Sequence, residues 1–303
     1  MHSHLSPETR SEVLIEALPY LQRFRGSTFV IKYGGAAMEE DQIVERFLRD
    51  VVFLEAVGIN PVLVHGGGKA ITARMRDAGL KAQFVNGLRV TDAQTIDIVA
   101  GTLDNEINPK IVENIQRFGG KAQGLSGAQV FLARRLPKQR LDTGEEIDFG
   151  FVGAAEKLHL TEVQTAIEQE VVPVISPVGA QEDGVRLNIN ADIAAASLAS
   201  ALKATKLIYV SDVPGIMRDP TQPESLIPTV SAPQVESLIK QKVIGGGMIP
   251  KIQSAVKALE DGVGKVHMIG GHIAHGLLLE IFTTSGIGTE ITLEPHPESP
   301  HLS

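Results

Sequence analysis

Two lysines in this sequence lie beside runs of glycine, at points where a helix is expected to begin. Lys32 belongs to Ile31-Lys32-Tyr33-Gly34-Gly35, and Lys251 ends the segment Gly245-Gly246-Gly247-Met248-Ile249-Pro250-Lys251. A phosphoryl group in transfer spreads negative charge over its oxygens, and two lysines on separate glycine turns could neutralise that charge. The alternative is that both are ordinary surface lysines whose stems lie on apolar surface.

A further glycine run, Gly66-Gly67-Gly68, follows an expected strand at 61–65. A strand that ends in glycines before a helix presents backbone N–H groups and the helix dipole to an anion, and glycine lets the anion approach closely. The spacing matches neither the Walker A loop nor the dinucleotide-binding fingerprint. Each glycine run is therefore either a phosphate-binding turn or a plain tight turn.

Two polar segments complete the candidate residues. In Asn188-Ile189-Asn190-Ala191-Asp192 the polar side chains alternate ahead of a small-residue helix at 193–202. Asp192 could cap that helix, bind magnesium or hold the lysines by ion pairing. Arg89 has the fork geometry that suits a carboxylate, or it forms a surface ion pair. The nine histidines show no metal-ligand spacing, so we expect no metal site in the protein.

The elements that must position these residues alternate between short β-branched runs and helix-length amphipathic segments. A helix is expected at 41–56, where apolar residues recur at helical spacing. Alternation of this kind predicts an α/β fold, a three-layer αβα sandwich with a mostly parallel central sheet. Strands are expected at 29–32, 61–65, 171–175, 206–210 and 265–269. Segments 128–133 and 147–152 instead suggest antiparallel hairpins at one sheet edge.

The first 25 residues form a separate element. Ser6-Pro7-Glu8 is a good helix start, with Ser as N-cap and Pro at the first helical position. Pro19 falls inside the helical pattern and should kink or interrupt it. The apolar stripe must be buried against another subunit or against the protein's own domain. That stripe consists of Val13, Ala17, Leu21 and Phe24.

Composition excludes several classes of protein. The chain has 303 residues, with 28 Lys and Arg against 36 Asp and Glu, so its net charge of −8 does not favour nucleic acid. It lacks Cys and Trp, and aromatic residues make up 4%. No apolar run approaches the ~20 residues of a membrane span, and the N-terminus does not look like a secretion signal. We expect a soluble, cytoplasmic protein, or a plastid one if a transit peptide has been removed.

Six segments, in order and with compatible spacing, together resemble the amino acid kinase superfamily, and within it the arginine-sensitive branch that acts on N-acetyl-L-glutamate. The resemblance implies ATP-dependent phosphorylation of the side-chain carboxylate of N-acetyl-L-glutamate in arginine biosynthesis. It also implies three parts: an N-terminal interface helix at 1–25, an acetylglutamate-binding and dimerisation lobe at 26–184, and an ATP-binding lobe at 185–303, with the boundary near 181–184. The six segments are VIKYGG (30–35), VHGGGK (64–69), NGLRVTD (86–92), NINAD (188–192), SDVPGI (211–216) and GGGMIPK (245–251).

The resemblance also implies residue roles. Lys32 and Lys251 would be the transition-state lysines, and Asp192 the acid that organises them. Substrate contacts are implied for Gly35, Gly67, Gly68, Arg89 and Asn188. ATP contacts are implied for Asp212, Val213, Pro214, Gly215, Ile216, Met217, Val243, Ile244 and Gly245. Mg²⁺ would arrive with the nucleotide.

Regulation is implied as well. In the arginine-sensitive branch an N-terminal helix interlaces dimers into a hexamer, and arginine binds beside it. Glu280 would receive the arginine guanidinium, with Tyr20 and Gly286 lining the site. The PII signal protein is a partner of this branch in oxygenic phototrophs.

Three other interpretations remain. An aspartate kinase would need a longer chain and usually carries Ser or Thr where this sequence has Ala36 and Ala37. Carbamate, uridylate and glutamate 5-kinases share the fold, but the segment at 86–92 favours acetylglutamate. A catalytically inactive arginine sensor is the third, and Lys32, Asp192 and Lys251 speak against it.

Overall fold

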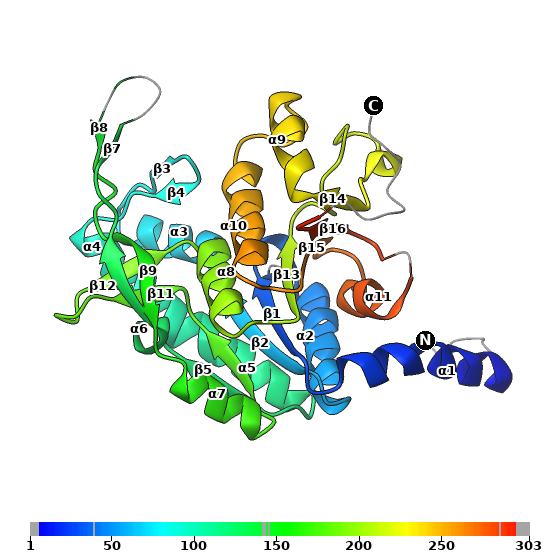
Figure 1. The fold of residues 1–303 in the computed structure, drawn as a ribbon. Coiled ribbons are helices and arrows are strands. Elements are labelled where there is room, and N and C mark those ends of the chain that lie inside the picture. The colour runs from blue at the N-terminus through cyan, green and yellow to red at the C-terminus, as the bar shows by residue number, and fades with distance from the viewer. Residues whose placement is uncertain (1–5, 39, 141–143, 145, 285, 295–303) are drawn as a thin grey trace.

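The computed structural model describes residues 6–294 except 39, 141–143, 145 and 285. An eight-stranded sheet forms its centre, and every neighbouring pair of strands is parallel except β15 and β16 (Figure 1). In spatial order the strands are β14 (Thr229–Ser231), β16 (Thr289–Thr292), β15 (Lys265–Gly270), β13 (Lys206–Ser211), β1 (Thr28–Tyr33), β2 (Asn60–His65), β10 (Val172–Ile175) and β5 (Ala122–Leu125). The five predicted strands are all present, each within a residue or so of its expected bounds.

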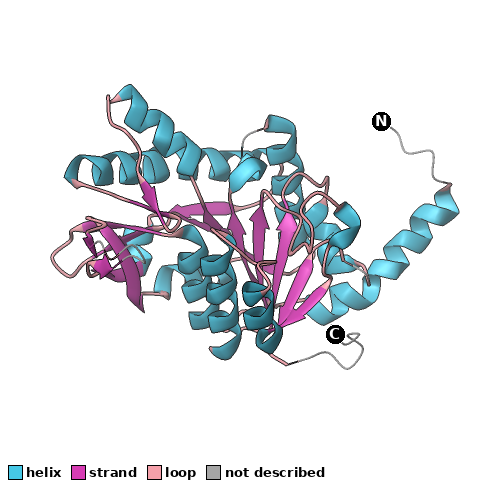
Figure 2. Ribbon diagram, turned by 90° about the horizontal axis from the view of Figure 1, so that it is seen from above, coloured by secondary structure: helices cyan, strands magenta, loops and turns pink. Residues whose placement is uncertain are grey.

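Helices cover both faces of the sheet, which confirms the three-layer prediction (Figure 2). Successive side chains of β1 enter different layers: Val30 belongs to one apolar core and Ile31 to another. Because both faces are buried, the central strands read as nearly continuous apolar runs. The helices are α2 (Asp41–Ala56), α3 (Gly68–Asp77), α4 (Ala93–Thr102), α5 (Asn108–Arg117), α7 (Thr161–Glu168), α8 (Ala191–Ala201), α9 (Ala232–Lys240), α10 (Met248–Glu260) and α11 (Gly276–Phe282), with short 3-10 turns at Gly35–Met38 and Pro223–Ser225.

The predicted hairpins are antiparallel, but they do not lie at the edge of the main sheet. β6 (Phe131–Arg135), β9 (Val152–Leu158), β11 (Val178–Ala180) and β12 (Arg186–Ile189) close into a small separate barrel. Segment 128–133 is not one strand, because Ser126 caps a short helix, α6 (Gly127–Val130), ahead of β6. Segment 147–152 is likewise divided. Two small pairs complete the fold: β3 (Phe84–Val85) with β4 (Leu88–Arg89), and β7 (Gln139–Arg140) with β8 (Glu146–Ile147).

Residues 181–184 form the turn that joins β11 to β12 inside this barrel. The main sheet nevertheless takes one half of its strands from each side of that turn. β1, β2, β5 and β10 come from 26–184, and β13 to β16 come from 185–303. This arrangement is compatible with two lobes, and the lobe assignment itself stays a proposal.

The N-terminal helix α1 (Pro7–Phe24) begins where predicted, with the Ser6 side chain accepting a hydrogen bond from the Thr9 N–H. Pro19 lies inside the helix without ending it. The helix extends away from the rest of the molecule (Figures 1 and 2). Only its C-terminal part packs on the protein's own domain, where the Phe24 side chain is buried and Tyr20 contacts Phe282 edge to face. The large apolar side chains that it exposes are Val13, Leu14, Ile15 and Leu18.

Candidate active site

Asp192 lies between the two predicted lysines. Its Oδ1 is 3.0 Å from the Lys32 Nζ, and its Oδ2 is 3.1 Å from the Lys251 Nζ. Lys32 comes from β1, Asp192 from the first turn of α8 and Lys251 from the first turn of α10. The three side chains expose only 12%, 17% and 13% of their surface. Residues up to 219 positions apart therefore form one charged cluster, and Lys32 and Lys251 are not ordinary surface lysines.

Asp192 does not cap α8. The N-cap is Asn190, whose Oδ1 accepts from the N–H groups of Asp192 and Ile193. Burial alone would raise the pKa of Asp192, but the charges of Lys32 and Lys251 outweigh it and hold the pKa below the usual value. Burial lowers the pKa of the Lys251 ammonium, and Asp192 opposes that shift. The carboxylate is therefore charged and lies within ion-pair distance of both lysines.

The two glycine turns lie side by side next to this cluster. The Gly66 N–H donates to the Tyr33 carbonyl at 2.6 Å, which joins the end of β2 to the end of β1. Gly35 has φ +69°, and a Cβ there would collide with the Asp212 carboxylate. A Cβ on Gly67 would collide with Leu103 and Ile107. The positive φ of Gly35 favours glycine there, and a side chain on Gly67 would force Leu103 and Ile107 to move.

A pocket of about 200 Å³ opens between the glycine turns, Arg89, Asn188 and Asp192. Arg89 is buried rather than at the surface, with 6% of the residue exposed, and makes no ion pair with a carboxylate in the described part of the chain. Its Nη2 donates to the Gly68 carbonyl at 2.8 Å and to the Thr72 hydroxyl at 2.9 Å. The alternative of a surface ion pair is therefore wrong for Arg89.

Aromatic and polar neighbours fix the orientation of these side chains. The Arg89 guanidinium lies 4.5 Å from the centre of the Phe84 ring, and its Nη1 is 3.1 Å from the Met75 sulfur. The Asn188 Nδ2 donates to the buried Thr91 hydroxyl at 3.2 Å. Thr72 and Met75 carried no signal in the sequence, and Thr91 entered only as part of the segment at 86–92, since the role of each depends on partners from other elements.

His65 contacts the backbone of the second glycine turn. The sequence alone gave no indication of this contact. Its Nδ1 is 2.9 Å from the Gly66 carbonyl, and its Nε2 is 3.2 Å from the Asn108 Nδ2, which donates onward to the Val174 carbonyl. Complete burial lowers the pKa of His65 to about 4. The ring is therefore neutral, with Nδ1 as donor and Nε2 as acceptor assigned from this network.

One predicted ATP segment adjoins the Gly35 turn, and the other precedes the helix that carries Lys251. Asp212 follows β13 directly and adjoins Gly35, and its charge adds a small opposition to the burial that lowers the pKa of Lys251. Residues 243–245 connect α9 to α10, which carries Lys251. Ile216 and Ile244 are buried in one apolar core, so a ligand could be contacted there only by their backbones.

A larger pocket, about 1050 Å³, brings together Tyr20, Glu280 and Gly286 at the junction of α1 and α11. Glu280 already has partners: its Oε1 is 2.6 Å from the His267 Nδ1, and its Oε2 accepts from the N–H groups of Ile287 and Gly288. Burial would raise the pKa of Glu280, but these partners hold it below the usual value. On the far side of the His267 ring lies Lys206, whose Nζ is 2.8 Å from Nε2 and whose pKa burial lowers to about 8.

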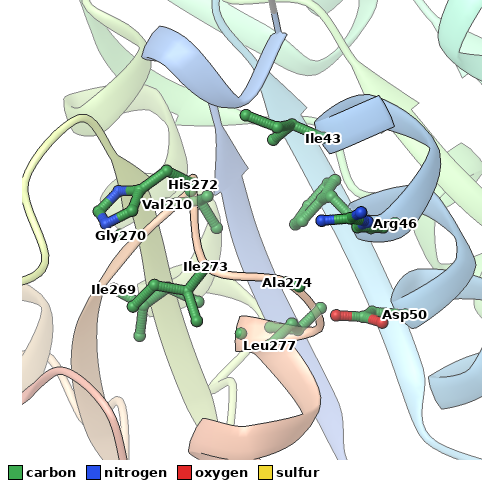
Figure 3. Close-up of a pocket in the computed structure, with 13 residues that line it drawn as sticks. Ile43, Arg46, Asp50, Val210, Ile269, Gly270, His272, Ile273, Ala274 and Leu277 are labelled. Atoms are coloured by element: carbon green, nitrogen blue, oxygen red, sulfur yellow. The ribbon is translucent and has the colours of Figure 1, made fainter. Parts of the chain in front are cut away.

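A small cavity of about 10 Å³ lies between α2, the ends of β13 and β15, and the start of α11 (Figure 3). Asp50 of α2 lies at its wall beside Ala274 and Leu277 (Figure 3). The volume is that of about one water molecule.

Among the described residues no group of three His, Asp or Glu side chains could hold a metal ion. No helix in that part of the chain is long and apolar enough to cross a membrane.

Comparison with known sequences identifies close relatives. The profile of the amino acid kinase family matches residues 27–270. A protein of Akkermansia muciniphila named acetylglutamate kinase is 50% identical over 287 residues, covering 94% of this chain and 96% of the relative. Proteins of the same name from Methanocaldococcus jannaschii and Synechococcus elongatus are 49% and 46% identical, each over 93% of this chain and over 96% and 92% of their own.

Comparison with solved structures gives the same fold. N-acetylglutamate synthase from Neisseria gonorrhoeae, in complex with coenzyme A and N-acetylglutamate, matches 94% of this chain with a TM-score of 0.81 and 28% identity. This chain spans 64% of that synthase. The same synthase with L-arginine matches with a TM-score of 0.77 and 27% identity, over 94% of this chain and 65% of the synthase. Carbamate kinase from Giardia lamblia shares the fold at 18% identity, with a TM-score of 0.65 over 89% of this chain and 99% of its own.

Proposed function

Since the chain belongs to the amino acid kinase family, we propose that it is an acetylglutamate kinase, which transfers a phosphoryl group from ATP to the side-chain carboxylate of N-acetyl-L-glutamate. The observation that carries the proposal is the cluster of Lys32, Asp192 and Lys251 beside a pocket lined by Arg89. In this proposal Lys32 and Lys251 lie where the phosphoryl group is transferred, and the buried Arg89 guanidinium lies where the acceptor binds.

The chemistry needs charge neutralisation and positioning rather than a base. A side-chain carboxylate with a pKa of ~4.3 is already ionised at neutral pH, so no proton has to be removed from the nucleophile. An ammonium group has three N–H donors, so Lys32 and Lys251 keep donors for phosphoryl oxygens while Asp192 holds them in place. N–H groups at the turns of Gly35 and Gly67 would add further donors.

The acceptor pocket has groups that suit an anionic amino-acid derivative. Three N–H groups of Arg89 have partners at Gly68, Thr72 and Met75, and the other two have none among the described residues. We assign the α-carboxylate of the acceptor to this buried guanidinium, which would bind it through its charge and one of the two remaining N–H groups, on Nε or Nη1. Asn188, held by Thr91, would contribute a second polar contact.

ATP is the phosphoryl donor in this proposal, and residues 212–217 and 243–245 are assigned to its binding. Their support is the position of Asp212 against Gly35 and the attachment of 243–245 to the helix that carries Lys251. The described residues bring no three acidic or histidine side chains together, and Mg²⁺ that arrives with a nucleotide needs only one or two protein carboxylates. Mg²⁺ is assigned to the nucleotide phosphates.

The test is an ADP-release assay on the purified full chain with ATP and, in separate reactions, N-acetylglutamate, glutamate or aspartate. Turnover with N-acetylglutamate alone supports the proposal. Preferred turnover with glutamate or aspartate would assign the protein to another branch of the family. No turnover with any of the three would favour an inactive sensor.

Feedback inhibition by arginine, a hexamer and a cytoplasmic location belong to the same proposal. The inhibitor would bind in the pocket that contains Tyr20, Glu280 and Gly286, with its guanidinium on Glu280. Because Glu280 already binds His267 and two backbone N–H groups, arginine would have to share or displace those contacts. The exposed apolar side chains of α1 support burial against another subunit. The PII protein stays a possible partner.

A further inference from the structure

A π-helical turn at Leu103–Ile107 joins α4 to α5 beside the acceptor pocket. π-helical turns are rare and occur frequently at functional sites. Within this turn Asp104 binds two other segments. Its Oδ1 accepts from the Ser176 hydroxyl at 2.5 Å, and its Oδ2 accepts from the Ser126 hydroxyl at 2.9 Å.

Each serine also accepts a hydrogen bond from a backbone N–H group of α6. The Ser176 Oγ accepts from the Gly127 N–H at 2.9 Å, and the Ser126 Oγ accepts from the Ala128 N–H at 3.3 Å. Ser176 follows β10 and is completely buried. A single carboxylate therefore ties together the π-helical turn, the end of β10 and the start of α6.

The residues next to these anchors form the wall of the acceptor pocket. Leu103 precedes Asp104, Pro177 follows Ser176, and both line the pocket. Leu103 and Ile107 also occupy the space beside Gly67 in which a Cβ would otherwise fit. A shift of the π-helical turn would therefore move both the pocket wall and the Gly67 turn.

We propose that Asp104 is a positioning residue for phosphoryl transfer, because it fixes the π-helical turn and the end of β10 around the acceptor. The inference rests on the function proposed above. Asp104 does not touch the acceptor; it acts through Leu103, Pro177 and Gly67. A misplacement of about 1 Å in such a site can reduce the rate by ~100-fold, so losing this anchor should be visible in kinetics.

The experiment compares Asp104→Asn with Glu106→Gln. Glu106 is a matched control, since it lies in the same π-helical turn but pairs with Arg74 at the surface, where the two side chains are 44% and 54% exposed. In Asp104→Asn, one serine hydroxyl loses its acceptor. We expect kcat/KM for N-acetylglutamate to fall by about 10- to 100-fold, with the KM for ATP changed by less than about twofold. Glu106→Gln should change neither.

Ser126→Ala is the second variant, in case Asp104→Asn folds poorly. It removes only the donor to Oδ2 and leaves Ser176 in place. We expect a loss of about 3- to 10-fold in kcat/KM for the acceptor, again with the KM for ATP nearly unchanged. Equal losses on the acceptor and ATP sides would show a general structural role and overturn the inference.

The outcome also separates this inference from the proposed function. An active wild type beside an equally active Asp104→Asn overturns the positioning role alone. A wild type that does not phosphorylate N-acetylglutamate overturns the proposed function, and this inference with it.

Discussion

Asp50 and His275 are 225 positions apart in the sequence, yet the Asp50 Oδ1 lies 2.6 Å from the His275 Nδ1. Asp50 belongs to α2, and its side chain is 2% exposed; His275 precedes α11 in a left-handed conformation with φ 55°. Burial raises the pKa of Asp50 to about 6, although His275 and the N–H groups of Leu277 and Leu278 oppose the shift. The contact connects α11, which carries Glu280, to α2, which follows the Gly35 turn.

We predict that His275→Ala destabilises the protein by about 1–3 kcal/mol, and more at pH 8 than at pH 5. Without its partner the buried Asp50 carboxylate is costly when charged, whereas at pH 5 it can take up a proton in the folded state. Urea unfolding at the two pH values measures the difference. In the double variant Asp50→Asn/His275→Ala, the destabilisation should be the same at both pH values. If His275→Ala alone destabilises the protein equally at pH 5 and pH 8, the prediction is contradicted.

Replacing either clustered lysine should affect turnover most. We expect Lys32→Ala and Lys251→Ala each to lower kcat by about 10²–10³-fold, with a much smaller change in the KM for N-acetylglutamate, because the charge develops in the transition state. Steady-state kinetics measure this. Lys257→Ala, on the same helix as Lys251 but 67% exposed, is the control and should be nearly wild type. Near-normal turnover in Lys32→Ala or Lys251→Ala would remove that lysine from the mechanism.

Arg89→Lys should raise the KM for N-acetylglutamate more than it lowers kcat. Lysine keeps the charge but loses the fork that reaches Gly68 and Thr72 while leaving donors for a carboxylate. Calorimetric titration of N-acetylglutamate into the variant gives the affinity directly. Arg74→Lys, which changes a surface arginine paired with Glu106, is the matched control. Unchanged affinity in Arg89→Lys would mean that Arg89 serves only to hold the pocket together.

His65 should make the protein less stable in acid. Its pKa falls from 6.5 in the unfolded chain to about 4 in the folded one, so the unfolded state binds more protons between these values. The stability from keeping the ring neutral is therefore present above pH 6.5 and is lost as the pH falls toward 4. Between pH 7.5 and pH 5 we expect wild type to lose about 2 kcal/mol more than His65→Gln. Denaturant titrations of both proteins at each pH measure the free energy of unfolding. If this free energy falls in parallel for the two proteins as the pH is lowered, the prediction is contradicted.

Arginine should inhibit the intact protein, and Glu280→Gln should raise the arginine concentration for half-inhibition by about tenfold or more while leaving uninhibited turnover in place.

Deleting residues 1–25 removes α1 and the exposed apolar side chains that it carries. We expect the truncated protein to sediment as a smaller assembly and to lose sensitivity to arginine. A truncated protein that stays hexameric and fully sensitive would exclude the helix from regulation, and an intact protein indifferent to millimolar arginine would exclude the regulation itself.

The main sheet and the helix at 41–56 could be predicted because their signals are local. Strands such as β1 are continuous apolar runs, and α2 repeats apolar residues at helical spacing, so neither needs distant partners to be recognised. The hairpin prediction at 128–133 was partly wrong because Ser126 starts a helical turn there before β6 begins. Whether antiparallel strands join a sheet edge or close a separate barrel depends on contacts that no local pattern contains.

The candidate site divides in the same way. Glycine turns and lysines were visible in the sequence, because phosphate chemistry favours those residue types at turns that precede helices. The sequence allows three roles for Asp192. Its position between Lys32 and Lys251, which come from other elements, shows that it pairs with both, while Asn190 caps α8. Asp104 gave no signal, and no role for His65 was visible although it lies in the segment at 64–69, because each acts through hydrogen bonds to segments tens of residues away. Residue types and their spacing limit the chemistry that is available. Which side chains meet depends on the packing of the whole chain, because packing sets burial and hydrogen bonding.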